Sequence, residues 1–520
     1  NSFYSLVPLL VVLVTFAYGV ARTILHLWLH HRLKLALLKK YERNPELLEG
    51  SEDPLELIQR QATRIGPAFE QDYIVTGIAL AVLGCGCVVA GRMIGLGEFA
   101  VGIYIGGMVC IALGILIALL GALTFAELGG MYQRNGGQYE MLRDAFGPLP
   151  AFMFVFCNAT AVQTGAIAAI AMICADRLVL AATGSAPEAG VQLGLSIVLI
   201  AGLVGANVVG VRWGSRIQNF TVYAKLATLG AVIAIAVFAA PDGQKTAQTI
   251  VQTDAAVTVG NGALATLGVL FAALVPAFFA FGGWQHAIWI SGEVKRPGRN
   301  VPLAIVVGVA IVATVYFVVN WAYLRLLGYE GVVSSSAAAA ESVSVVWRGA
   351  GRVIAGAVAV SAFGVLNAQF LSGPRLIFGM AQDGRFFEPF GKVSKRWGTP
   401  ILAIALLGVM ATALLWATSL SSSADKSIGL LLTGVVFVDA LFLALTGASL
   451  VILRLKRPGA DRPVHVPVYP LVPVLFVLSE VGILIGAWLV SEQRIAAAVG
   501  AAWIIVAGVV FLLFFRKASH

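Results

Sequence analysis

Residues 302–326 read PLAIVVGVAIVATVYFVVNWAYLRL, an apolar run in which Arg325 is the single charged side chain. A helix needs about 20 apolar residues to cross the hydrocarbon core of a bilayer, so this run is long enough to span a membrane. Similar runs recur along the chain and indicate about thirteen spans in an all-α polytopic membrane protein. They lie near residues 4–28, 73–95, 101–126, 149–178, 190–210, 219–240, 260–289, 302–326, 350–372, 400–418, 428–453, 469–490 and 493–515.

The composition agrees with a protein that lies mostly in lipid. Of its 520 residues, 59% are hydrophobic and only 12% are charged, whereas a soluble domain has about 25% charged residues. The net charge of +9 comes from Lys and Arg residues in short loops between the apolar runs. Such residues mark topology, so we expect a lipid bilayer as partner and no nucleic acid.

The distribution of basic residues predicts the orientation of the chain. The loop after the first run and every second loop after it are basic, as at Arg212 and Arg216 and at Lys295, Arg296 and Arg299. Because basic loops stay on the cytoplasmic side, we expect an outside N-terminus, a cytoplasmic C-terminus and an odd number of spans in the cell membrane.

Residues 1–71 form a segment of their own in this scheme. The basic residues follow the first run instead of preceding it, which favours a permanent membrane anchor over a cleaved signal peptide. Residues 33–71 alternate apolar and charged positions, as in an amphipathic cytoplasmic segment. This segment is either a linker on the membrane surface or a regulatory element.

Two runs carry glycines that are able to interrupt a membrane helix. The second contains Met93-Ile-Gly-Leu-Gly-Glu-Phe99, and the seventh contains Phe278-Phe-Ala-Phe-Gly-Gly-Trp284. An interrupted helix exposes backbone N–H and C=O groups, and the N–H groups at a half-helix start suit a carboxylate. Glycines in membrane helices also serve close packing, so each motif alone permits either interpretation.

Polar groups within the apolar runs are the other candidates. Lys225, in Tyr223-Ala-Lys-Leu, costs at least about 2.5 kcal/mol inside a membrane, so it either has a task there or extends its amine to the cytoplasmic surface. Interhelical hydrogen bonds are the expected role of Asn158, Gln163 and Asn207. The remaining intramembrane polar groups are Arg92, Glu127, Asn367, Asp439 and Glu480.

No sequence pattern indicates an enzyme. The five cysteines lie within or beside apolar runs, and none is paired with His at metal-ligand spacing. Cys85-Gly-Cys87 is a weak redox or metal signal without further ligands. Nucleophile, metal and phosphate motifs are absent from the sequence, so we expect no enzymatic activity, cofactor or metal.

Several ordered motifs resemble the amino acid, polyamine and organocation transporter superfamily, in particular its L-type amino acid transporter branch and bacterial relatives. The resemblance covers roughly residues 90–515. Its motifs are Gly121-Ala-Leu-Thr-Phe-Ala-Glu-Leu-Gly129, Arg134-Asn-Gly-Gly-Gln-Tyr139, Phe279 to Trp284, Gly292-Glu-Val-Lys-Arg-Pro-Gly-Arg-Asn-Val-Pro302, Gly373-Pro-Arg375, Ala381-Gln-Asp-Gly384 and Arg457-Pro458.

This resemblance implies a transporter core of ten helices in two inverted five-helix repeats over residues 72–455. Two further spans and a cytoplasmic C-terminus follow over 456–520. It implies that substrate lies between the broken second and seventh runs. The implied roles are substrate binding by Gly95, Leu96, Gly97, Phe279, Phe281, Gly282 and Gly283, replacement of a sodium ion by Lys225, and gating or structural roles for Glu127, Trp284 and Asn367.

The function that follows is secondary transport of amino acids, expected to be neutral and independent of sodium, as exchange or uptake. Leu96 and Glu98 depart from the residue types usual at the first break, and the first 90 residues have no counterpart in the family. These departures favour one alternative, a sensor or scaffold that does not transport. The sequence leaves an oligomer or an accessory subunit open.

Overall fold

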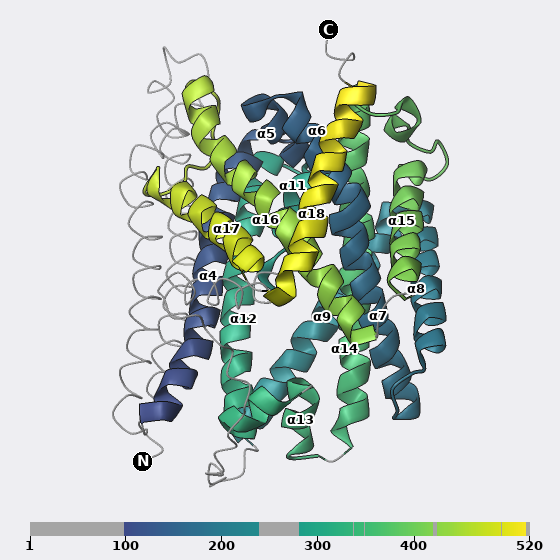
Figure 1. The fold of residues 1–520 in the computed structure, drawn as a ribbon, viewed down its shortest axis with the longest axis vertical. Coiled ribbons are helices and arrows are strands. Elements are labelled where there is room, and N and C mark those ends of the chain that lie inside the picture. Colours follow the sequence, from purple (N-terminus) through teal and green to yellow (C-terminus); the bar gives the residue numbers. More distant parts are fainter. Residues whose placement is uncertain are drawn as a thin grey trace, which may run out of the picture. The chain divides into compact units, whose positions relative to one another are not determined.

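A computed structural model describes residues 98–238, 280–335, 337–347, 349–419, 424–489 and 491–515 (Figure 1). Within these ranges all regular elements are helices, and nine are long and apolar enough to cross a membrane. The prediction of an all-α polytopic membrane protein is therefore confirmed. The runs predicted near 4–28 and 73–95 lie outside the described residues.

The bounds of the helices follow the apolar runs. The elements are α4 (Glu98–Met131), α5 (Gly137–Phe146), α6 (Pro148–Cys157), the π-helical turn η2 (Asn158–Val162), α7 (Gln163–Thr183), α8 (Ala189–Val209), α9 (Val211–Phe238), α11 (His286–Trp289), η3 (Ser291–Glu293), α12 (Pro297–Ser334), α13 (Ala338–Ser344), α14 (Ala350–Gln382), η4 (Glu388–Gly391), α15 (Ile401–Ser419), α16 (Ala424–Lys456), α17 (Leu471–Leu489), α18 (Ser491–Val510) and the π-helical turn η5 (Phe511–Phe515).

Local sequence explains where these helices begin and end. Pro148 starts α6 because proline suits the first turn of a helix, and α6, η2 and α7 then form one continuous span. Gly184 ends that span in the left-handed conformation with a φ of 83°, and its N–H donates to the carbonyl of Leu180 at 2.9 Å. α9 and α12 begin at Val211 and Pro297, before the predicted starts at 219 and 302, because both helices continue through basic residues beyond the apolar run.

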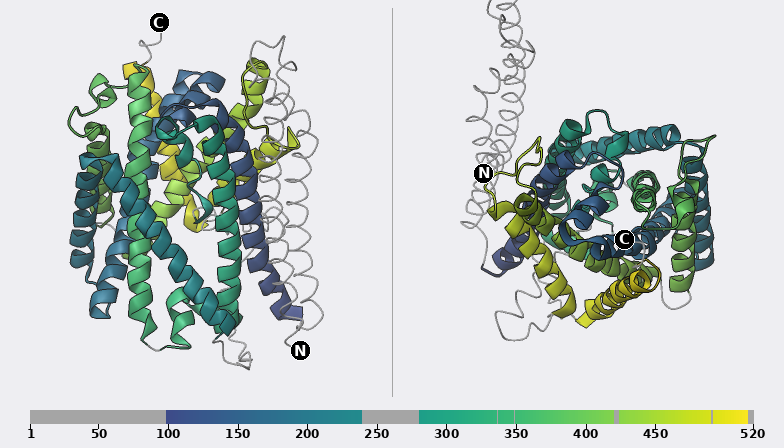
Figure 2. Two further views of the ribbon diagram at one scale, coloured as in Figure 1. Left: turned by 180° about the vertical axis from the view of Figure 1, so that it is seen from behind. Right: turned by 90° about the horizontal axis from the view of Figure 1, so that it is seen from above.

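The chain forms two compact units, residues 1–112 and 113–520, and the packing below is that within the second unit. There α14 packs along α7 and α9, while α17 and α18 pack against α16. α8 and α15 lie side by side (Figure 2). α5 and the short helix α13 lie toward opposite ends of this bundle (Figure 1).

The apolar surface of the bundle suits a lipid environment. Large apolar side chains point outward from α8, α9 and α18, and Val198, Phe220 and Ile505 each expose about two thirds of their surface (65%, 68% and 67%). A water-facing surface of this kind would be unfavourable, whereas hydrocarbon tails are as apolar as these side chains. The chain is therefore a multi-pass membrane protein.

Glu127 is a fully buried carboxylate at one end of α4. It forms ion pairs with Arg454 at 2.5 Å and with Arg462 at 3.4 Å, and it accepts the backbone N–H of Val466 at 2.7 Å. Buried charges need such partners, because the loss of hydration is otherwise not compensated. Glu127 thus connects α4 with α16 and with the segment that follows α16.

Asn367 performs a similar connection inside the bundle. Its side-chain amide on α14 donates to the carbonyl of Gly214 at 2.8 Å, and its oxygen accepts the amide N–H of Asn207 at 3.1 Å. α14 is thereby joined to α8 and α9 by buried hydrogen bonds.

Candidate functional site

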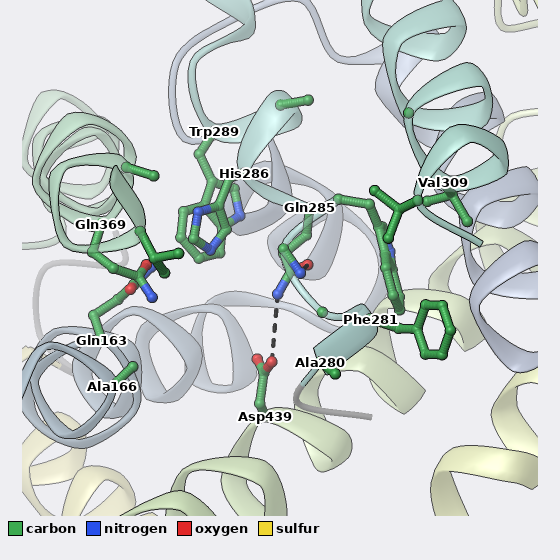
Figure 3. A pocket seen from close by; sticks show the side chains of 18 of the residues that line it. Gln163, Ala166, Ala280, Phe281, Gln285, His286, Trp289, Val309, Gln369 and Asp439 are labelled. Atoms are coloured by element: carbon green, nitrogen blue, oxygen red, sulfur yellow. Dashed lines mark hydrogen bonds between the residues drawn. The ribbon is translucent and has the colours of Figure 1, made fainter. Parts of the chain in front are cut away.

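A cavity of about 640 Å³ lies within the helical bundle (Figure 3). Residues of η2, α7, α9, α12, α14 and α16 line it, together with residues 280–287 and Trp289. Pockets for small molecules have volumes of about 300–1,000 Å³, so this cavity is large enough for a small organic solute.

One wall of the cavity is an interrupted helix. Helical backbone at Ala280 and Phe281 stops at Gly282 and Gly283, and helix resumes only at His286. Gly283 has a φ of 112°, a conformation that favours glycine because it has no Cβ. The interruption predicted within Phe278–Trp284 is therefore present, and it leaves backbone groups beside the cavity outside the regular helical hydrogen bonds.

Hydrogen bonds hold both sides of the interruption in place. The hydroxyl of Tyr316 on α12 donates to the carbonyl of Ala280 at 3.2 Å. On the other side, the N–H of Gly283 donates to Oε1 of Gln285 at 3.0 Å, and Nε2 of Gln285 donates to a carboxylate oxygen of Asp439 at 3.4 Å (Figure 3). Gln285 therefore links the interrupted helix to α16.

The short helix α11 is fixed by its own side chains. The ring of His286 stacks on that of Trp289 with centroids 4.3 Å apart, and its Nδ1 lies 3.0 Å from the hydroxyl of Ser372. The indole N–H of Trp289 donates to Gln138 at 2.8 Å, and the amide of Gln138 donates to Thr446 at 2.9 Å. α11 is thus connected to α5, α14 and α16.

The walls of the cavity combine amides with two opposite charges. Amide side chains that both donate and accept come from Gln163, Gln218, Gln285 and Gln369. Among the described lining residues, Lys225 carries a positive and Asp439 a negative formal charge. A solute with donors at one end and acceptors at the other would find partners on these walls.

A set of polar contacts lies at the end of the bundle near α5, and we call it the α5 network: Tyr139, Arg143 and Asp383. The Tyr139 hydroxyl donates to Asp383 at 2.8 Å, and Arg143 forms an ion pair with Asp383 at 2.8 Å. Burial and the hydrogen bond to Asp383 raise the pKa of Tyr139, so its phenol stays protonated and remains a donor. The network joins α5 to the end of α14.

The structure brings part of the predicted site together. Phe281, Gly282, Gly283, Trp284 and Lys225 all line the cavity, although Lys225 comes from a different helix. Two other predicted residues, Glu127 and Asn367, make the interhelical contacts described above and are not among the lining residues. The predicted carboxylate site at Gly95, Leu96 and Gly97 and the predicted gate Phe279 lie outside the described residues.

Among the lining residues that were not predicted as part of the site, three stand close to the interruption or carry charge: Gln285, His286 and Asp439. Gln285 and His286 directly follow Gly282-Gly283-Trp284, so the polar pair beside a glycine break was a signal within the motif itself. Asp439 was recognisable as a carboxylate in an apolar run, but its position relative to the break depends on how α16 packs.

A cavity with polar and charged side chains inside an apolar helical bundle, bordered by an interrupted helix, is typical of the class of multi-pass membrane transport proteins. A family model described as amino acid permease matches residues 80–515, and the chain belongs to this family. Membership identifies a transporter and not an enzyme.

Individual relatives agree with the family. The chain is 28% identical over 432 residues to the b(0,+)-type amino acid transporter 1 of Homo sapiens, which covers 82% of this chain and 84% of the relative. It is 28% identical over 367 residues to the cystine/glutamate transporter of Homo sapiens, covering 69% and 68%. It is also 28% identical over 409 residues to the large neutral amino acids transporter small subunit 2 of Mus musculus, covering 76% and 74%.

Proposed function

We propose that this chain is a secondary transporter that carries neutral amino acids across the cell membrane without sodium, by alternating access around the cavity. The observation that carries the proposal is the cavity with amide and charged side chains beside the interruption at Gly282 and Gly283. The family and the names of the relatives support amino acids as the solute class.

The lining supports a neutral substrate. An amino acid carries an ammonium and a carboxylate on its α-carbon, so these two charges cancel. The described walls likewise offer one acidic residue, Asp439, and one basic residue, Lys225, together with several uncharged amides. An acidic or basic side chain would bring one uncompensated charge into this low-dielectric space, which is costly. A neutral side chain avoids that cost.

The roles within the site follow the family pattern. We assign the substrate carboxylate to backbone N–H groups of Gly95, Leu96 and Gly97, and the ammonium to carbonyls near Phe279 and Gly282. Phe279 then covers the site, and Phe281 and Gly283 also contact the substrate. Lys225 takes the place of a sodium ion. The core of this transporter is residues 72–455, followed by two spans over 456–520.

Orientation and partners belong to the same proposal. The basic loops support an outside N-terminus, before the anchor in residues 1–71, and a cytoplasmic C-terminus. One relative is by name a small subunit, which supports association of this chain with an accessory subunit. The α5 network would then lie at the cytoplasmic end and would have to open for substrate release.

Counterflow in proteoliposomes tests this function. Vesicles preloaded with an unlabelled neutral amino acid should accumulate the labelled form equally in sodium and in choline buffer. Gly283→Val should abolish accumulation, because a branched side chain is strained at a φ of 112° and enters the cavity. Gly398→Val is the matched control, since Gly398 has a φ of 69° in an exposed turn.

Two results would argue against the proposal. Accumulation that collapses in choline buffer would contradict transport without sodium. Binding of amino acids by the wild type without any counterflow would favour a sensor or scaffold in place of a transporter.

A further inference from the structure

An open groove of about 410 Å³ lies between α7, α8, α9 and α14, and it shares no lining residue with the cavity described above. We call it the α9 groove, because α9 contributes more of the described lining residues than any other helix. Its walls are mainly apolar and include Leu178, Leu199, Ile217, Phe220, Val360 and Phe363. Such a lining favours an apolar chain over a water-soluble ligand.

The α9 groove opens toward the bilayer. Three of its lining side chains, Leu178, Trp213 and Phe220, expose 42%, 55% and 68% of their surface. Large exposed side chains of this kind on a membrane helix face hydrocarbon. A ligand therefore enters the groove from the lipid, and lipid itself is the most abundant ligand there.

Two uncharged polar groups of the groove have partners within the protein. The hydroxyl of Thr221 donates to the carbonyl of Gln218 at 3.0 Å, and the thiol of Cys174 donates to the carbonyl of Ala359 at 3.4 Å. Because these groups are already hydrogen-bonded, they require no polar ligand.

Arg216 differs from them, because it is the single charged residue among the described lining residues. Its guanidinium lies 5.7 Å from the ring centroid of Trp213. The apolar span of α9 begins at Trp213, so Arg216 lies about 5 Å into this span along the helix axis. Arginine and tryptophan at the end of a span are typical of the membrane interface, where lipid headgroups lie.

No carboxylate of the surrounding helices neutralises Arg216. α8, α9 and α14 contain no Asp or Glu, and the one acidic residue of α7, Asp176, pairs with Arg177 at 3.2 Å. Within the ranges that the structure describes, no residue forms an ion pair with Arg216. A cation at the end of an apolar groove suits a ligand that supplies both a negative charge and an apolar chain.

We propose that the α9 groove binds an anionic phospholipid. The phosphate of its headgroup pairs with the guanidinium of Arg216, which is able to donate two parallel hydrogen bonds to phosphate oxygens. One acyl chain lies along Ile217, Phe220 and Phe363. Neutral lipids fill the groove less tightly, because they bring no net charge to Arg216.

The bound lipid lies against a helix that also lines the cavity. Gln218 and Lys225 of α9 are cavity residues, and Oε1 of Gln218 accepts the side-chain amide of Asn367 at 3.3 Å. Thr221, which lines the groove, packs directly on Gly364 of α14. The lipid therefore supports the position of α9 against α14 and with it that of Lys225. This consequence for transport rests on the proposed function.

Native mass spectrometry of the purified protein tests the headgroup site. The protein is titrated in detergent with dioleoyl phosphatidylglycerol or dioleoyl phosphatidylcholine. The wild type should bind the anionic lipid at least about fivefold more tightly, the effect of one basic residue on an anionic lipid. Arg216→Gln should abolish this preference, whereas Arg216→Lys should keep it. Arg299→Gln is the matched control, since Arg299 is an exposed arginine of α12 outside the groove.

Two further variants test the place of the acyl chain. Val360→Trp fills the groove and should weaken binding of both lipids to a similar extent. Phe220→Ala removes an exposed wall and should do the same without disturbing the core of the bundle. Neither variant removes Arg216, so the residual binding should still favour the anionic lipid.

Counterflow tests the support of α9. Wild-type protein should transport faster in vesicles that contain phosphatidylglycerol than in vesicles of phosphatidylcholine alone. This difference should be lost in Arg216→Gln and kept in Arg299→Gln.

The outcomes separate this inference from the proposed function. Equal affinity of the wild type for the two lipids, an unchanged preference in Arg216→Gln, or unchanged binding in both Val360→Trp and Phe220→Ala would each overturn the lipid site. Equal counterflow in the two kinds of vesicle would overturn the support of α9 by lipid. Absence of counterflow in every vesicle would instead contradict the transport function, and the mass spectra would still decide whether the groove binds an anionic lipid.

Discussion

At the residue scale, Lys225 and Asp439 are the informative pair of the cavity. They lie on α9 and α16 and bring opposite formal charges to walls that otherwise consist of uncharged side chains. An ionisable side chain inside a membrane protein is expensive to keep unless it serves a task. Their common placement on one cavity balances the formal charge of its walls, which suits a solute without net charge.

Lys225→Ala should lower the initial rate of counterflow at least about tenfold, which corresponds to about 1.4 kcal/mol. The substitution removes the positive charge from the cavity wall. The negative charge of Asp439 then has no counterpart among the described lining residues. Initial rates in proteoliposomes measure the effect. Lys392→Ala serves as control, because Lys392 is 68% exposed and pairs with Glu388 away from the cavity. Equal rates for the two variants would remove Lys225 from the mechanism.

The sequence alone left Lys225 between two interpretations, a site residue and an amine that extends to the membrane surface. The choice between these interpretations depends on which face of α9 packs toward α12 and α14. The sequence does not identify that face, because the apolar faces of α9 suit contact with other helices and contact with lipid equally well. For the same reason Asp439 was recognised as unusual but not as part of the site.

At the element scale, apolar length and glycine position predicted most helices and the interruption at Gly282 and Gly283. The hydrogen bonds that orient α11 were beyond prediction, since Gln138, Trp289 and Thr446 are far apart in sequence and meet only through the fold. The resemblance placed Glu127 and Asn367 in the family pattern, whereas their partners Arg454 and Asn207 come from the packing.

Gly121 on α4 is the element-scale test of this packing. A Cβ there would lie 2.8 Å from the ring of Phe476 and 2.9 Å from that of Trp284, which lines the cavity. Gly121→Ala should therefore destabilise the protein by about 1–3 kcal/mol and weaken substrate binding, because the Trp284 ring must shift. Thermal unfolding in detergent and ligand-induced thermal shifts measure both effects.

Gly202→Ala provides the comparison for Gly121→Ala. Gly202 lies within α8, and a Cβ at this position meets open space. Alanine there should be neutral or slightly stabilising, since it has the higher helix propensity. If the two variants unfold alike, the close contact of α4 with Trp284 and α17 does not limit stability.

At the scale of the whole molecule, the described helices form a bundle with apolar outward faces and, inside it, a cavity that amide and charged side chains help to line. Buried ionic and amide contacts connect its helices at Glu127 and Asn367, and the α5 network joins α5 to the end of α14. Alternating access requires that such polar contacts break and re-form while the apolar packing moves as larger bodies. Among the described residues the polar contacts between helices are local, whereas the apolar contacts extend along the helices, as such a motion requires.

The most direct test of the account is a structure determined with the amino acid that is transported best in counterflow. We predict density for that molecule in the cavity, beside Gly283 and between Lys225 and Asp439. A ligand bound elsewhere on the protein, or an empty cavity at a concentration that saturates transport, would contradict the central claim that this cavity is the substrate site.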